Sequence, residues 1–165
     1  MVSGYKDNDL IIWDITDNYK DKYKIKEVRI SLLIFTNNNQ DYIITNAGFS
    51  GSYTKIYSFN DCSYITNIKY KNFIQVEYLL PWLNKNDNQY YIIQLAYFNG
   101  IFINDLLKGK LYANLANYEY GNYNTGFIYN KDNKDYLCVS SKYNSINNDI
   151  EIWDLYNKNY QKFFY

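Results

Sequence analysis

Short apolar segments alternate with polar turns along the whole chain. The segments are rich in Ile, Leu, Tyr and Phe, and the turns, such as 37–41 and 130–135, are rich in Asn, Asp and Lys. Asn and Asp favour turns because their side chains bond the local backbone and tolerate left-handed angles. None of the apolar segments follows the period of a helix. The pattern predicts an all-β chain of short antiparallel strands.

One apolar segment, which ends in a Trp-Asp pair, returns along the chain. The four copies of this pair are Trp13-Asp14, Tyr57-Ser58, Asn104-Asp105 and Trp153-Asp154. Successive copies lie 44, 47 and 49 residues apart, and the first and last are the best preserved. A period in the forties is typical of propellers and solenoids. We therefore predict one repeat array over 1–165 rather than several domains.

The repeats are expected at about 1–27, 28–72, 73–119 and 120–165. The first contains three predicted strands and each of the others contains four, among them 73–80 and 126–129. Some segments, such as Leu10-Ile-Ile-Trp13, are apolar at every position. A strand needs this pattern when both faces of its sheet are covered by other sheets. The expected architecture is a stack of small antiparallel sheets.

The composition supports strands. The chain holds 22 Tyr, 9 Phe and 3 Trp but a single Pro, and 47% of its residues are apolar. Aromatic residues fit the half-buried surface of a sheet. The excess of Tyr, Asn, Lys and Ile is also what AT-rich codons impose, so most of the tyrosines need no functional explanation.

Charge balance and missing residue types exclude several functions. Lys plus Arg number 17, and Asp plus Glu also number 17, so no net charge attracts nucleic acid or an anionic membrane. The chain contains no His, and Cys62 and Cys138 lie far apart. A His-based catalytic pair and a zinc site are therefore excluded. We expect no enzyme activity, no metal, no cofactor, and neither nucleic acid nor membrane as a partner.

The expected location is the cytoplasm. The N-terminus lacks the layout of a signal peptide, and no apolar run reaches the roughly 18 residues of a membrane helix. No Asn-x-Ser/Thr acceptor for glycosylation occurs in the sequence.

The motif around the first copy resembles the WD40 repeat. Gly4 and Asp7 fall on the turn glycine and turn aspartate of that family, and Trp13-Asp14 falls on the dipeptide that names it. Trp153-Asp154 matches the same dipeptide after a longer turn. The resemblance implies a WD40-like β-propeller segment of about four blades.

The resemblance extends to the turns, with departures. Segments 35–40 and 129–134 look like the Phe-Ser-Pro-Asp-Gly-Lys turn of the family, and Pro81 looks like its surviving proline. The family's Gly-His dipeptide is absent, so the His, Ser/Thr, Asp and Trp network of an ordinary blade cannot form. We therefore expect degenerate blades that are held more by aromatic packing than by a polar network.

Propellers of this family usually have seven blades, so the chain resembles about half of one, an incomplete propeller. An open array would expose an apolar sheet face at each end, and faces of that size seldom stay solvated. We expect the remainder of the propeller, encoded on a longer or a separate polypeptide, or self-association with a second copy, to cover them.

The most distinctive residues of the repeat have structural interpretations. Trp13 and Trp153 occupy the same position in two repeats, which favours an inter-blade core over a ligand-stacking site, and Tyr57 is the structural repeat residue at that position in the second repeat. Aspartates also recur at the end of the same segment, where the family uses them in turn bonds and not as an acid–base pair. They are Asp14, Asp105 and Asp154.

The resemblance places the partner site on the loops that join second to third strands. These loops offer the rim residues Tyr5, Lys6, Phe49, Tyr53, Tyr97, Phe98 and Tyr143. Aromatic side chains are suited to a protein-binding hot spot. The predicted function is a non-catalytic scaffold that mediates protein–protein interactions through this rim. The alternatives are the recognition arm or propeller domain of a larger enzyme, hydrolase or kinase-linked, and a decayed gene fragment.

Overall fold

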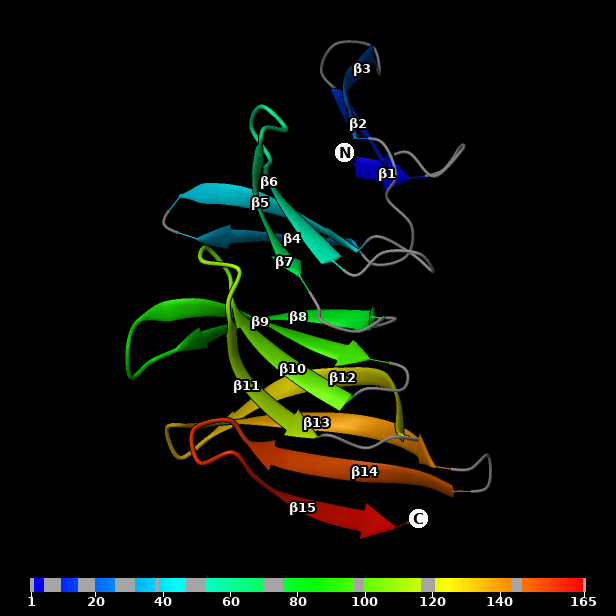
Figure 1. The fold of residues 1–165 in the computed structure, drawn as a ribbon, viewed down its shortest axis with the longest axis vertical. Coiled ribbons are helices and arrows are strands. Elements are labelled where there is room, and N and C mark those ends of the chain that lie inside the picture. The colour runs from blue at the N-terminus through cyan, green and yellow to red at the C-terminus, as the bar shows by residue number, and fades with distance from the viewer. Residues whose placement is uncertain are drawn as a thin grey trace. The chain divides into compact units, whose positions relative to one another are not determined.

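The structure is a computed structural model. It describes residues 2–4, 10–14, 20–25, 32–37, 39–46, 53–69, 76–96, 100–116, 121–143 and 147–164. These residues form antiparallel strands in four small sheets (Figure 1). They divide into two compact units, Met1–Phe73 and Ile74–Tyr165. Nowhere in the described ranges is there a helix of the length and apolar character that crossing a membrane requires.

The first unit contains two sheets in which neighbouring strands follow chain order. Sheet A consists of β1 (Val2–Gly4), β2 (Leu10–Asp14) and β3 (Lys20–Ile25). Sheet B consists of β4 (Leu32–Asn37), β5 (Gln40–Asn46), β6 (Tyr53–Ser58) and β7 (Tyr64–Lys69). A small core joins the two sheets, since Leu10 and Ile25 of sheet A cluster with Ile43 and Tyr57 of sheet B.

The second unit repeats this plan with longer strands. Sheet C consists of β8 (Val76–Asn84), β9 (Gln89–Ala96), β10 (Gly100–Asp105) and β11 (Leu111–Ala116). Sheet D consists of β12 (Gly121–Lys131), β13 (Lys134–Tyr143), β14 (Asn147–Asp154) and β15 (Asn159–Phe164). The all-β, antiparallel prediction is confirmed, with three strands in the first sheet and four in each of the others.

Two predicted boundaries are wrong. β8 runs past Pro81, which is paired with Ile92 and lies inside the strand, so Pro81 is not a turn proline. Proline is tolerated there because β8 is an end strand of its sheet, where a missing N–H need not break a ladder bond. β12 exceeds the predicted 126–129 because its polar first half also pairs with β13, past a register shift between Tyr123 and Thr125.

Sheets A, B and C share a register shift between the strand that ends in the recurring pair and the strand that follows it. It falls immediately before the first residue of the recurring pair, at Ile12/Trp13, Ile56/Tyr57 and Ile103/Asn104. A bulge at this point increases the local twist of the strand pair. The recurrence of the irregularity shows that the copies read from the sequence occupy equivalent backbone positions in sheets A, B and C.

The turns after the third strands of sheets B, C and D are also equivalent. Each has one residue with positive φ near its end: Cys62 at 55°, Gly109 at 62° and Lys158 at 59°. In each, the backbone N–H that follows the recurring pair donates to a carbonyl of the second strand. These bonds are Phe59 N to Asp41 O, Leu106 N to Tyr90 O and Leu155 N to Asp135 O, at 2.9, 3.2 and 3.1 Å.

The core of the second unit lies between sheets C and D. Its buried members are Trp82, Tyr91, Ile93, Leu95, Ile101, Ile103, Ala113, Tyr123, Leu137, Val139, Trp153 and Leu155. Gly126 of β12 lies at the closest point of this packing. A Cβ on it would lie 2.9 Å from Val139 Cγ1 and 3.0 Å from both Cys138 O and Leu95 Cδ1.

We expect Gly126→Ala to lower the free energy of unfolding by about 1–3 kcal/mol, because the added methyl overpacks the contact between β12 and sheet C. Urea unfolding monitored by Trp fluorescence measures the change. Thr125→Ala, at an exposed neighbouring position, is the control and should shift stability by less than about 0.5 kcal/mol. Equal stability of wild type and Gly126→Ala would contradict this packing.

Candidate functional site

Most of the predicted rim residues lie outside the described residues. These are Tyr5, Lys6, Phe49, Tyr97 and Phe98. Tyr143 is the last residue of β13, and only its backbone is described. Tyr53 opens β6, where its half-buried ring lies 5.2 Å from the ammonium of Lys55. The described residues therefore bring no group of rim residues together, and the rim stays a prediction.

The recurring pair ends β2 in the three-stranded sheet A and the third strand in each of the other sheets. Trp13 and Asp14 end β2, and their side chains lie outside the described residues. Tyr57 is buried in β6 and meets the ring of Tyr64 edge-on at 6.0 Å between centroids. Trp153 is buried in the core of the second unit.

Asp105 and Asp154 make the same turn bonds in two sheets. Asp105 Oδ1 accepts from the backbone N–H groups of Leu107 and Lys108, at 3.1 and 2.9 Å. Asp154 Oδ1 accepts from the corresponding N–H groups, two and three residues further on, at 2.9 and 3.0 Å. Burial opposes ionisation of Asp154, but these bonds, chiefly those from Asn157, hold its pKa below the ordinary value. Both carboxylates therefore cap a turn.

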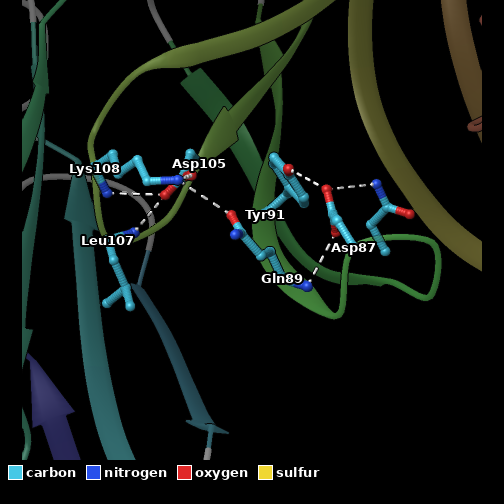
Figure 2. Close-up of polar contacts among 7 residues, drawn as sticks. Asp87, Gln89, Tyr91, Asp105, Leu107 and Lys108 are labelled. Atoms are coloured by element: carbon cyan, nitrogen blue, oxygen red, sulfur yellow. Dashed lines mark hydrogen bonds and ion pairs between the residues drawn. The ribbon is translucent and has the colours of Figure 1, made fainter.

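Figure 2 shows the polar contacts at the turn end of sheet C. Lys108 Nζ lies 3.2 Å from Asp105 Oδ2 and 3.4 Å from Gln89 Oε1. Tyr91 Oη donates to Asp87 Oδ2 at 2.7 Å, and Gln89 N donates to Asp87 Oδ1 at 3.0 Å. Burial and the hydrogen bond to Asp87 both raise the pKa of Tyr91 well above its ordinary value. The Tyr91 hydroxyl therefore stays protonated at neutral pH and donates a hydrogen bond there.

A buried carboxylate, Asp135, joins sheets C and D. Its Oδ2 accepts from Trp82 Nε1 at 3.1 Å and from Tyr156 Oη at 2.7 Å. Its Oδ1 accepts from Asn130 Nδ2 at 2.6 Å and lies 3.7 Å from Lys85 Nζ. Trp82 and Lys85 belong to sheet C and its first turn, whereas the other donors belong to sheet D. The carboxylate therefore bonds across the interface as well as within its own sheet.

The surroundings of Asp135 favour its ionised form. Burial acts against the charge, but the hydrogen bonds from Asn130, Tyr156 and Trp82, with the charge of Lys85, hold the pKa of Asp135 below its ordinary value. The same arrangement, through burial and the bond to Asp135, raises the pKa of Tyr156 to about 12. Neither group is poised to exchange a proton near pH 7, where a general acid or base works best.

Aromatic rings surround this carboxylate. Trp82 lies 5.5 Å from Tyr91, 5.7 Å from Tyr156 and 6.5 Å from Tyr112, measured between ring centroids. Tyr91 and Tyr112 are 4.5 Å apart. Lys158 Nζ lies 4.6 Å from the centroid of Tyr112, a distance at which cation–π attraction operates.

A second buried carboxylate, Glu151, lies on β14. Its Oε2 accepts from Tyr123 Oη at 3.0 Å and from Trp153 Nε1 at 3.2 Å. The second unit therefore has buried polar bonds beside the aromatic packing that the sequence predicts. Each of the two tryptophans of this unit, Trp82 and Trp153, packs its ring in the core and donates its indole N–H to a buried carboxylate.

Sequence reasoning missed Asp135 and Trp82 as a pair because they lie 53 residues apart. The sequence did contain a sign of this site, because a tyrosine recurs at the same position of the repeat. Tyr42, Tyr91 and Tyr136 each pair with the last residue of the third strand: Ser58, Asp105 and Asp154. Each also pairs with an aromatic residue of the first strand, and these partners are Phe35, Trp82 and Tyr129.

The described residues hold no group of three or more His, Cys, Asp and Glu side chains that could bind a metal ion. Cys62 and Cys138 are not joined in a disulfide and are both of intermediate exposure, and burial raises the pKa of Cys138. Comparison of the sequence with models of protein families and with curated proteins finds no match.

We expect Asp135→Asn to lower the free energy of unfolding at pH 7 by about 2–4 kcal/mol. An amide removes the charge and turns an N–H group toward donors that need an acceptor. Urea unfolding followed by Trp fluorescence measures the loss. Asp132→Asn is the matched control, because Asp132 is an exposed turn residue at φ 51°, which Asn adopts readily.

The destabilisation by Asp135→Asn should depend on pH. Because the folded pKa of Asp135 lies below its unfolded value, the wild-type advantage is complete above the unfolded pKa and is lost as pH falls through the folded pKa. The difference between wild type and Asp135→Asn should therefore shrink as the pH falls below the ordinary carboxyl pKa towards the lower, folded-state pKa of Asp135. A difference that is constant over this range would show that the charge of Asp135 is not what stabilises the unit.

Proposed function

We propose that the chain is a non-catalytic, cytoplasmic scaffold of WD40-like repeats, part of a β-propeller, which binds other proteins through the loops between second and third strands. The observation that carries this proposal is the recurrence of one strand and turn unit. Sheets B, C and D share the left-handed turn residue, the N–H bond back to the second strand and the tyrosine that pairs with the end of the third strand.

The roles of the carboxylates favour a scaffold over an enzyme. Asp105 and Asp154 bond turn N–H groups, and Asp135 and Glu151 accept from buried indole and phenol donors. Side chains used in this way fix the geometry of the sheets. A rigid framework reduces the entropy cost of binding, because the loops it carries are already positioned.

The strand order supports a rim at one end of each sheet. Each sheet is an antiparallel meander, so the connection from its second to its third strand lies opposite the connections on either side of it. Residues 47–52, 97–99 and 144–146 make these connections, and residues 5–9 make the corresponding connection of the three-stranded sheet A, from β1 to β2. They include Tyr5, Phe49, Tyr97 and Phe98, and large aromatic side chains are the type most often found at binding hot spots.

Affinity capture by the tagged full-length chain, followed by identification of the bound proteins, tests the function. We expect one or a few partners, and we expect Tyr5→Ala, Phe49→Ala and Tyr97→Ala combined in one chain to reduce their capture at least tenfold. Loss of a central hot-spot residue costs about 2 kcal/mol or more, which exceeds a tenfold change in affinity.

The control for this triple variant combines Tyr64→Ala and Tyr78→Ala, two exposed tyrosines on strands rather than on the connecting loops. Circular dichroism and urea unfolding establish that each variant is folded. Full capture by the folded triple variant would overturn the rim assignment, and hydrolase or transferase activity of the pure chain would overturn the scaffold.

A further inference from the structure

Two tyrosines of sheet C lie in close ring contact. The centroids of Tyr91 on β9 and Tyr112 on β11 are 4.5 Å apart, and the ring planes are tilted by 49°. Aromatic pairs in proteins have centroids about 4.5–7 Å apart, so this pair lies at the short end of the range. The facing edges of the two rings are therefore at van der Waals contact, about 3.5–4.0 Å between carbon atoms.

A bulge in β11 brings these rings together. Asn104 of β10 pairs with Leu111 and Ile103 pairs with Ala113, which leaves Tyr112 as the extra residue between them. A residue inserted in this way is not held by the regular alternation of the ladder. Since β10 lies between β9 and β11, the two tyrosines meet across β10. The contact therefore belongs to a single sheet.

The two phenols have different surroundings. Tyr91 is buried, and its hydroxyl donates to the carboxylate of Asp87 at 2.7 Å (Figure 2). Tyr112 is 39% exposed, and Lys158 Nζ lies 4.6 Å from the centroid of its ring. A positive charge beside a ring opposes removal of an electron from it, whereas a carboxylate that takes the phenol proton assists the removal. An electron vacancy in this pair is therefore more stable on Tyr91 than on Tyr112.

We propose that Tyr91 and Tyr112 form an oxidative modification site, at which a diffusible one-electron oxidant joins the two rings as dityrosine. This inference goes beyond the scaffold function and does not depend on it. One equivalent of oxidant removes an electron from the pair, and the phenol proton of Tyr91 passes to Asp87. A second equivalent removes an electron from Tyr112, whose phenol proton passes to water.

The two phenoxyl radicals then couple through ring carbons ortho to the oxygens. A carbon–carbon bond forms, and the hydrogen on each joined carbon moves to the phenol oxygen of the same ring, which restores both aromatic rings. In total the site loses two electrons to the oxidant and two protons, so the product is two hydrogen atoms lighter. The new bond fastens β9 to β11 across β10.

Photo-oxidation of the full chain at low protein concentration, with tris(bipyridine)ruthenium(II) and persulfate as the source of a one-electron oxidant, tests the site. Trypsin leaves Tyr91 in peptide 86–108 and Tyr112 in peptide 111–131, because lysines flank both peptides. We expect mass spectrometry to find the two peptides joined, with a mass two hydrogen atoms below their sum. Fragmentation should place the bond between positions 91 and 112.

Three variants test the assignment of the residues. Tyr112→Phe keeps a ring but removes the phenol, so it should lose this link. Tyr129→Phe is the matched control and should give the wild-type yield, because Tyr129 is an exposed tyrosine on β12, outside this pair. Asp87→Asn removes the proton acceptor of Tyr91 and should lower the yield. Circular dichroism establishes that each variant is folded, and the peptide map of the wild type decides the matter where a variant does not fold.

A second pair of tyrosines serves as an internal comparison. Tyr57 and Tyr64 also combine a buried and an exposed ring, but they meet edge-on at 6.0 Å between centroids, so a link between them should be less abundant. Equal yields at the two pairs, links spread over the exposed tyrosines, or an unchanged yield in Tyr112→Phe would overturn the site. An unchanged yield in Asp87→Asn would overturn the role of Asp87. None of these results bears on the scaffold function, because the experiment uses no partner.

Discussion

The fold depends on a requirement that both faces of a sheet be covered. In β9 the consecutive residues Ile92 and Ile93 are both fully buried, and in β5 Ile43 and Ile44 are both fully buried. Neighbouring residues of a strand point to opposite faces, so an apolar run of this kind leaves neither face suited to water. Each such sheet therefore needs other sheets packed on it to be stable, which explains why the sheets of this protein pack on one another and do not occur singly.

Apolar coverage does not by itself determine how one sheet rests on the next. In the second unit Asp135 fixes how sheet C lies on sheet D. Its carboxylate accepts hydrogen bonds from Trp82 of sheet C, and from Asn130 of sheet D and Tyr156 of its last turn. A buried carboxylate is tolerated only when hydrogen-bond donors or a cation pair with its oxygens. A slip of one sheet over the other would break these bonds and leave the charge of Asp135 unpaired. Gly126 acts in the same sense by sterics, since it has no room for a side chain between Val139 and Leu95.

Sequence reasoning predicted local features well because they depend on local chemistry. The strand number of each sheet, the Asn-rich turns at Asn39 and Asn133 with positive φ, and the repeat position of Tyr57 followed from residue types and spacing. Pro81 was misplaced because its place in an end strand depends on the partners of β8, which sequence spacing does not show. The Trp82–Asp135 bond was missed for the same reason, since it joins different repeats.

The packing of one sheet on the next has a direction within each unit. Leu10 and Ile101 meet the Tyr57 and Trp153 positions, so each interface joins unlike faces. The residues that meet hold different places in the repeat, since Leu10 and Ile101 lie three residues before the recurring pair and Tyr57 and Trp153 lie at its first position.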